Sequence, residues 1–429
     1  MRRREAIGLI AGAPLALAQT NNLDVSMIAV PGEGGKYWPR WRGPSGQGLV
    51  AGSGYTDRWS DTENVVWSTE IPGVGNSSPV VWADRIFLTT GEGSRRSVLC
   101  LSRRDGKLLW QTHAPNAPAE HIHRKNTLAS GTAATDGEYV YAFLGNQGLL
   151  AVDFEGRVAW HRDLGTMANY HGPAGSPLLY KDRVILYLDQ GRSSWGSNRG
   201  AEGVKGFVAA FDRKTGKTLW RVERNESVGW GTPVAIRAGG RDEIIVHSQY
   251  KVYSYDPASG KQLWTCDGPT MEVVPTPVAG HGLVFCSSGR AGPTFAIRPG
   301  GSGDVTGTHI AWSTQRGSPF IPSPLLLGEY LYTVNDMASI GTCFEAKTGK
   351  TMWQGRMGEA ARESFSVSPV AVGGKVFFTN DQGETFVLKA GPEFQVLHVN
   401  RFNERTLASP ALVDGRWYWR TSRRLLAIA

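Results

Sequence analysis

The sequence holds few clusters of side chains that could do chemistry, and the first is His121-Ile-His123. Two histidines separated by one residue lie on the same side of a strand and could supply two ligands to a metal ion. Arg124 and Lys125 follow directly, and their positive charges would repel a cation. We therefore predict a polar loop that makes hydrogen bonds here, and no metal site.

Two other motifs resemble catalytic loops. Gly216-Lys-Thr218 and Gly349-Lys-Thr351 are similar to the end of a phosphate-binding loop. The first glycine of that loop is missing from both, and each triplet lies between two strand-like segments instead of opening a helix. The nucleophile motif Gly-x-Ser-x-Gly is absent from the sequence. These motifs identify no catalytic residue.

The four cysteines indicate neither a redox motif nor haem attachment, because no two of them have the Cys-x-x-Cys spacing. Cys100 and Cys343 each lie six residues before a glycine, at Gly106 and Gly349. They therefore hold the same position in two copies of a repeat, which favours small buried side chains over a disulfide.

That repeat is the strongest pattern in the sequence. A strand, a polar turn with glycine and lysine, two residues and a tryptophan recur along the chain. Glycine suits the turn because it adopts a positive φ without strain. The clear copies are 101–110, 211–220, 255–264 and 344–353, and degenerate copies end at Trp160 and Trp312.

A second recurrent unit precedes each turn. It begins with Ser-Pro or Thr-Pro and continues as two short β-branched or aromatic strands joined by a turn. Four strands in each period of 41 to 56 residues are typical of a propeller blade. Eight units start at positions 79, 133, 177, 233, 277, 324, 369 and 410.

The unit that starts at Pro410 has no fourth strand, whereas residues 64–71 have the tryptophan-bearing pattern of a fourth strand with no blade before it. We therefore predict an all-β, eight-bladed β-propeller of four-stranded antiparallel blades, closed by residues 64–71 pairing with the C-terminal blade. Closure would cover sheet edges that otherwise favour aggregation.

These repeats resemble the PQQ-like (quinoprotein-type) propeller repeat. Residues 210–220, Ala-Phe-Asp-Arg-Lys-Thr-Gly-Lys-Thr-Leu-Trp, are close to its tryptophan-docking motif, and residues 37–44 are similar to the lead-in of secreted bacterial members. The superfamily includes the quinoprotein alcohol dehydrogenases and an outer-membrane assembly lipoprotein. The resemblance implies that indoles dock between blades. The docking tryptophans are Trp67, Trp110, Trp160, Trp220, Trp264, Trp312 and Trp353.

The resemblance does not transfer the cofactor. The adjacent cysteines typical of the alcohol dehydrogenases are absent, and their calcium ligands and catalytic aspartate match no particular positions here. Because a shared fold does not imply a shared function, we expect a binding or scaffold propeller without a cofactor. The alternatives are a dehydrogenase of alcohols or sugars that uses PQQ with calcium, and a propeller that assists outer-membrane protein assembly.

The polar and aromatic insertions all fall on one face of the predicted ring. In antiparallel blades, the loop between the second and third strands and the connection to the next blade emerge on the same face. Loops on a rigid scaffold often carry recognition. We predict that this face binds a polar ligand, a glycan or a protein segment, and the alternative is that these are ordinary solvated loops. The candidate residues are His121, His123, Arg124, Asn126, His171, Trp195, Trp230, Arg316 and Glu363.

The N-terminus predicts export. Three arginines precede an apolar stretch too short to span a membrane, and Ala16-Leu-Ala18 is a signal-peptidase motif. We predict a signal peptide over 1–18 (the paired arginines also fit twin-arginine export), a lead-in over 19–61 and the propeller over 62–429. The net charge of +8 comes from scattered residues, which argues against nucleic-acid binding. We expect a periplasmic or secreted protein that does not span the membrane.

Overall fold

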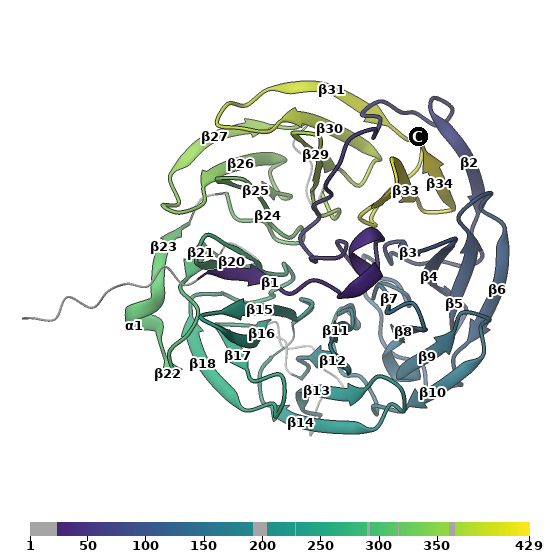
Figure 1. Ribbon diagram of the computed structural model, residues 1–429, viewed down its shortest axis with the longest axis horizontal. Coiled ribbons are helices and arrows are strands. Elements are labelled where there is room, and N and C mark those ends of the chain that lie inside the picture. The colour runs from purple at the N-terminus through teal and green to yellow at the C-terminus, as the bar shows by residue number, and fades with distance from the viewer. Residues whose placement is uncertain (1–23, 192–203, 228, 290–291, 316, 360–364) are drawn as a thin grey trace, which may run out of the picture.

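The computed structural model describes residues 24–429 except 192–203, 228, 290–291, 316 and 360–364. The predicted signal peptide lies outside these residues. The described chain forms eight sheets arranged radially around a centre, which confirms the eight-bladed propeller (Figure 1). None of the described helices is long and apolar enough to cross a membrane.

Each blade is an antiparallel meander that runs outward from the centre. Blade 1 consists of β3 (Val80–Trp82), β4 (Arg85–Glu92), β5 (Arg95–Ser102) and β6 (Leu108–His113). Blade 2 consists of β7 (Ala134–Thr135), β8 (Tyr139–Phe143), β9 (Leu149–Asp153) and β10 (Val158–Arg162). Blade 3 consists of β11 (Leu178–Tyr180), β12 (Arg183–Leu188), β13 (Gly206–Asp212) and β14 (Thr218–Arg224). Blade 4 consists of β15 (Val234–Ala238), β16 (Arg241–His247), β17 (Lys251–Tyr255) and β18 (Gln262–Asp267).

The second half of the ring repeats this order. Blade 5 consists of β19 (Val278–Gly280), β20 (Leu283–Ser287), β21 (Thr294–Ile297) and β23 (Ile310–Thr314). Blade 6 consists of β24 (Leu325–Leu327), β25 (Tyr330–Asn335), β26 (Ile340–Glu345) and β27 (Thr351–Arg356). Blade 7 consists of β28 (Val370–Val372), β29 (Lys375–Thr379), β30 (Glu384–Lys389) and β31 (Val396–Arg401). Blade 8 consists of β32 (Ala411–Val413), β33 (Arg416–Arg420), β34 (Arg424–Ile428) and β2 (Val65–Glu70).

The ring closes as the sequence predicts. Strand β2 pairs antiparallel with β34, from Val65 opposite Ile428 to Glu70 opposite Arg424. The fourth strand of blade 8 therefore comes from the N-terminal part of the chain. Strands β2 and β34 lie side by side in Figure 1. This pairing covers the outer edge of β34.

The serine or threonine at the start of each blade, followed by proline except at Thr132-Ala133, also links the blades. The backbone N–H of the serine or threonine before each inner strand donates to the side-chain hydroxyl of the equivalent residue in the next blade, at 2.9–3.3 Å. These seven bonds run from Ser78 round to Ser409. Each blade is thus tied to its neighbour near the axis, where the strands converge.

The described part of the lead-in starts at the centre of the ring, in front of the inner strands, and then runs outward to β2 (Figure 1). Strand β1 (Val25–Met27) pairs antiparallel with β15, and a 3-10 helix follows at Gly32–Lys36. Trp38 then pairs with Val81, and Leu49 pairs with Ala371. The lead-in therefore uses backbone groups of inner strands that have no neighbour on the axial side.

Blade 4 is larger than the four strands that the sequence predicts. Besides β1 on its inner edge, it carries β22 (Gly303–Asp304) on its outer edge, parallel to β18. The short helix α1 (Thr306–His309) follows β22. The extra strand comes from blade 5, where residues 298–309 replace the tight turn that joins the third and fourth strands in the other blades.

Indoles of the outer strands lie against the next blade. Six of the seven predicted docking tryptophans donate from Nε1 to a backbone carbonyl of the following blade, at 2.8–3.2 Å. Trp264 differs, since its Nε1 donates to Glu243 Oε2 inside its own blade. Blade 7 has no such tryptophan. The strand register puts His398 in the equivalent position, where its Nε2 contacts the backbone oxygen of Asp57 at 2.6 Å.

The turn glycines pack against these indoles. Gly216 has a φ of +68°, and a β-carbon there would lie 2.6 Å from the Trp160 ring. We expect Gly216→Ala to lower the free energy of unfolding by about 2 kcal/mol, because the side chain adds both backbone strain and a clash. Urea denaturation would measure this. Gly240 has a φ of +79° and open space where a new methyl group would lie. Gly240→Ala therefore measures the loss of stability caused by backbone strain alone. Equal losses in the two variants would contradict a docking role for Trp160.

All four cysteines are free and buried, two of them at the repeat position inferred from the sequence. Burial raises the pKa of the Cys100 and Cys343 thiols to about 12. They therefore stay protonated at neutral pH and are not poised for redox chemistry.

Candidate functional site

The connections between blades meet around a cavity on the axis of the ring. It has a volume of about 230 Å³ and is open on the face where these connections emerge. Almost every connection contributes a side chain, so the cavity belongs to the ring as a whole. Its lining consists of Asn76, His123, Lys125, Asn126, Ser130, His171, Ala174, Trp230, Val274, Phe320, Ile321, Ser366, Asp381, Arg405 and Leu407.

Aromatic and imidazole rings form one side of this axial cavity. The His123 and His171 ring centroids are 4.6 Å apart, and His171 meets Trp230 edge-on at 5.0 Å. Tyr170 lies edge-on to His171 at 4.7 Å and is 6.0 Å from His121. The rings belong to three successive connections, after blades 1, 2 and 3. Successive rings meet edge to face, so a flat ligand could stack on one ring and meet the next with its edge.

Hydrogen bonds hold these rings in place. Trp230 Nε1 donates to Asn169 Oδ1 at 2.9 Å and to the Gly172 oxygen at 3.0 Å. Asn126 Nδ2 donates to the His171 oxygen at 2.8 Å, and the Ser130 hydroxyl donates to Asn126 Oδ1. The side chains of this wall are therefore positioned before any ligand arrives, as a binding site requires.

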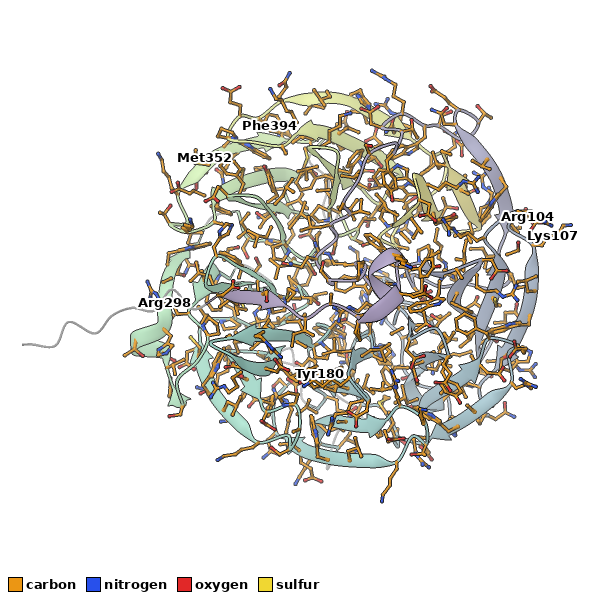
Figure 2. The ribbon with its side chains drawn as sticks, in the orientation of Figure 1. Arg104, Lys107, Tyr180, Arg298, Met352 and Phe394 are labelled. Atoms are coloured by element: carbon orange, nitrogen blue, oxygen red, sulfur yellow. The ribbon has the colours of Figure 1, made fainter. Side chains whose placement is uncertain are left out.

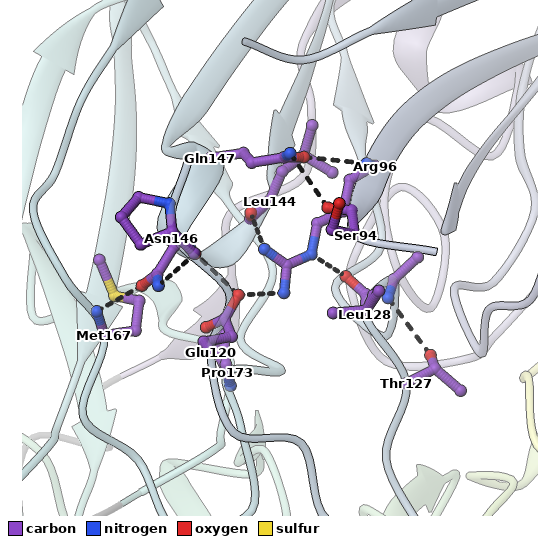
Figure 3. A network of polar contacts seen from close by, with 12 residues as sticks. Ser94, Arg96, Glu120, Thr127, Leu128, Leu144, Asn146, Gln147, Met167 and Pro173 are labelled. Atoms are coloured by element: carbon purple, nitrogen blue, oxygen red, sulfur yellow. Dashed lines mark hydrogen bonds and ion pairs between the residues drawn. The ribbon is translucent and has the colours of Figure 1, made fainter. Parts of the chain in front are cut away.

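The connection that carries His123 and Asn126 is anchored by a buried ion pair (Figure 3). Arg96, in β5, pairs with Glu120, and their side chains are 3% and 2% exposed. Arg96 also donates to the oxygens of Leu128 and Leu144, at 2.5 and 2.7 Å. One guanidinium thus joins the connection after blade 1 to the body of blade 1 and to the inner loop of blade 2.

Acidic groups lie at the opposite side of the cavity. Asp381 is 4% exposed and accepts a hydrogen bond from the Ser366 hydroxyl at 3.2 Å. Burial raises the pKa of its carboxyl, and the charges of Lys125 and Arg405 oppose the shift. Asp336, in the corresponding turn of blade 6, accepts from the Phe320 N–H at 2.7 Å. The cavity therefore combines an apolar ring surface with charged groups of both signs.

Burial raises the pKa of Asp336 to about 6. The folded chain then binds this proton more tightly than the unfolded chain, so stability falls as the pH rises from about 4 to about 6. We expect the stability of Asp336→Asn relative to the wild type to increase by about 2–3 kcal/mol between pH 4 and pH 7. Urea denaturation across this range would measure it. Parallel pH profiles for the two proteins would show that the carboxyl is not perturbed.

Four of the nine residues predicted for the binding face line the axial cavity, namely His123, Asn126, His171 and Trp230. His121 lies outside this lining, with its ring centroid 6.0 Å from that of Tyr170. Arg124 is exposed and lines a neighbouring cavity. Trp195, Arg316 and Glu363 lie outside the described residues. The predicted face remains a prediction as a binding site, although the geometry explains how loops far apart in the sequence share one cavity.

Sequence reasoning missed Asp336 and Asp381. Both belong to an Asn-Asp pair at the end of the second strand, at 335–336 in blade 6 and 380–381 in blade 7. The same dipeptide in the same repeat position of adjacent blades was the available signal.

The described residues contain no group of three or more histidine, cysteine, aspartate or glutamate side chains that could hold a metal ion. The cavity does contain basic groups in Lys125 and Arg405 and a large aromatic ring in Trp230. These suit a flat anionic ligand. The chemistry of the described donors thus fits a quinone such as PQQ better than it fits the calcium ion that would accompany it.

A family model described as outer membrane protein assembly factor BamB matches residues 41–201 and 204–300. Among curated proteins, the dehydrogenase subunit of the quinone alcohol dehydrogenase from Gluconacetobacter polyoxogenes is 27% identical over 258 residues, covering 56% of this chain and 31% of the relative. Tetrathionate hydrolase from Acidithiobacillus ferrooxidans is 23% identical over 380 residues, covering 86% and 62%. The chain thus spans 31% to 62% of the length of these relatives.

Solved structures show the same fold. BamB from Moraxella catarrhalis matches with a TM-score of 0.61 and 13% identity, covering 85% of this chain and 96% of that one. Quinohemoprotein alcohol dehydrogenase from Comamonas testosteroni matches with a TM-score of 0.60 and 13% identity, covering 91% and 80%. At this identity the likeness concerns the arrangement of blades and not the site.

Proposed function

This chain belongs to the PQQ-like repeat propeller family whose model is described as outer membrane protein assembly factor BamB, and on this premise we propose that it is a ligand-binding propeller of the cell envelope. The observation that carries the proposal is the convergence of the blade connections on one axial cavity. A rigid ring that presents loops to a shared, partly apolar cavity is the usual architecture of a small-molecule site.

The chemistry of the cavity favours a ring-shaped polar ligand such as a sugar. One face of such a ligand would stack on one of the His171 and Trp230 rings and its edge would meet the other, because these two rings are nearly perpendicular with centroids 5.0 Å apart. Its hydroxyl groups would reach Asp381, Ser366 and Lys125 on the other side of the cavity. Carboxylates and amines that face aromatic rings recognise the edge and the face of a sugar at once.

Saturation-transfer NMR with a panel of envelope sugars and short peptides tests this proposal. We expect signal from a sugar with the wild type, and its loss in Trp230→Ala and in His171→Ala. His281→Ala is the matched control, because this histidine lies in a turn on the opposite face, where its Nε2 hydrogen-bonds to the Gly328 oxygen. Circular dichroism would verify folding of each variant. No signal from the panel, or equal signal in all variants, would contradict the proposal.

A PQQ-dependent dehydrogenase is the second candidate. The aromatic ring of Trp230 and the cations of Lys125 and Arg405 could hold a flat, anionic quinone in the axial cavity. When bound, the quinone would accept the electrons that an alcohol or sugar gives up. Titration with PQQ and calcium separates the candidates. Stoichiometric quinone binding with alcohol- or sugar-dependent dye reduction would establish the enzyme. The absence of both effects would rule out the dehydrogenase.

The cell envelope is part of the proposal and rests on two expectations. The N-terminal sequence predicts export, and the family description concerns an outer-membrane assembly factor. A protein partner in the envelope is therefore a further candidate ligand. Crosslinking in intact cells followed by purification of the chain would test it, and a chain found only in the cytoplasm would contradict the location.

A further inference from the structure

A second cavity lies beside the axial one, at the seam between blades 8 and 1. It has a volume of about 250 Å³. Four basic residues line it, Arg124, Lys125, Arg405 and Arg420, and its lining includes no aspartate or glutamate. We call it the seam cavity. Positive charge gathered in a partly enclosed space without acidic residues is unusual for a surface of mixed charge, because each cation repels the others.

Arg420 is the buried member of this group, with an exposed fraction of 3%. Its Nη1 donates to the backbone oxygens of Ser77 and Thr89, at 3.2 and 2.8 Å, and to the Ser77 hydroxyl at 2.6 Å. Its Nε and Nη2 donate to no residue that the structure describes, and no described carboxylate pairs with it. A buried guanidinium without a counter-ion carries a large desolvation cost.

The repeat shows that the charge of Arg420 is not a requirement of the blade. The strand registers align Arg420 with one residue at the end of the second strand in every other blade. The seven equivalents are Thr89, Phe143, Tyr187, His247, Ser287, Val334 and Thr379. Burial lowers the pKa of the one histidine among them, His247, to about 4, so that it is neutral at pH 7. Blade 8 alone places a cation in this position.

The other arginines of the seam cavity are also free to bind. Arg124 and Arg405 are exposed and form no ion pair within the described parts of the chain. The nearest acids are engaged elsewhere. Glu404 pairs with Arg424 at 2.6 Å. Asp381 lines the axial cavity, where its charge interacts with that of Arg405 and its carboxyl accepts a hydrogen bond from Ser366. The Asn76 amide and the Ser422 hydroxyl also line the seam cavity without a described hydrogen-bond partner.

We propose that the seam cavity is an anion site that binds a doubly charged oxyanion of the sulfate or phosphate class through Arg124, Arg405 and Arg420. Planar guanidinium groups match the spacing of two oxygens on such an anion, and Asn76 and Ser422 supply neutral donors. The anion would neutralise the buried charge of Arg420. It would do so at the junction of blades 8 and 1, which none of the seven N–H to hydroxyl hydrogen bonds between neighbouring blades spans. This site adjoins the axial cavity and shares Asn76, Lys125 and Arg405 with it, whereas Arg124 and Arg420 line the seam cavity and are not part of the axial lining.

Isothermal titration of the full chain with sodium sulfate and sodium phosphate, against sodium chloride at matched ionic strength, tests the site. We expect saturable binding of one anion per chain. The double variant Arg124→Gln/Arg405→Gln should weaken it about ten-fold or more, as loss of two charge-assisted contacts implies. These two side chains are exposed, so folding should be preserved.

Two controls make the outcome decisive. Arg104→Gln removes an exposed arginine in the turn between β5 and β6, at the outer rim (Figure 2) and on the face opposite the blade connections, and should leave the dissociation constant unchanged. Trp230→Ala should also leave it unchanged, because Trp230 lines only the axial cavity. Heats no larger for sulfate and phosphate than for chloride would overturn the proposal, as would equal binding by the double variant. Loss of binding in Trp230→Ala would place the anion in the axial cavity instead.

Discussion

Replacing Trp59 with alanine is expected to lower the free energy of unfolding by about 3–5 kcal/mol, the usual effect of removing a large buried aromatic side chain. Trp59 is 2% exposed and lies between the last two blades. Its ring centroid is 5.1 Å from that of Trp417 and 6.0 Å from that of Phe377. The lead-in therefore supplies a core residue at the place where the ring closes, so the loss should weaken closure itself.

Equilibrium denaturation in urea measures this effect, with the slope as a check on cooperativity. Leu109→Ala is the control, because Leu109 lies on an outer strand and is 43% exposed. We expect it to change stability by less than about 0.5 kcal/mol. A loss below about 1 kcal/mol for Trp59→Ala would mean that the lead-in lies on the ring without contributing to its core.

The blades could be predicted from the sequence because they repeat. Every predicted blade start directly precedes an inner strand, and the hairpin glycines and tryptophans occupy equivalent positions. The path of the lead-in could not be predicted. The pairing of β1 with β15 occurs once, joins residues more than 200 positions apart and leaves no period in the sequence. The histidine that replaces a tryptophan in blade 7 was hidden for a similar reason, because its significance depends on a contact with Asp57.

The candidate site divides in the same way. The loops that carry His123, His171 and Trp230 were recognisable because strand direction alone puts them on one face. Their convergence on the axis depends on backbone conformation in connections of up to 20 residues, which has no sequence signature. Arg420 shows a further limit. It lies within a strand, and only the register that aligns the eight blades reveals that a cation replaces a neutral residue there.

Replacing Glu120 with glutamine is expected to lower the free energy of unfolding by about 3–5 kcal/mol, because it leaves the Arg96 guanidinium buried without a counter-ion. Burial raises the pKa of the Glu120 carboxyl, and Arg96 opposes that shift. The control is Glu223→Gln, which breaks an exposed ion pair. The side chains of Lys205 and Glu223 in this pair are 55% and 61% exposed. That change should cost less than about 1 kcal/mol in the same urea experiment.

A second variant shows whether the loss comes from the unpaired charge or from altered packing. In Arg96→Met/Glu120→Gln no charge remains buried, so the double variant should be more stable than Glu120→Gln alone. A double variant less stable than Glu120→Gln would indicate that the Arg96 hydrogen bonds to Leu128 and Leu144 matter more than its charge. Because these bonds fix the connection that carries His123 and Asn126, the pair links the stability of blade 1 to the shape of the axial cavity. Ligand binding should therefore weaken in Glu120→Gln even under conditions where the variant remains folded.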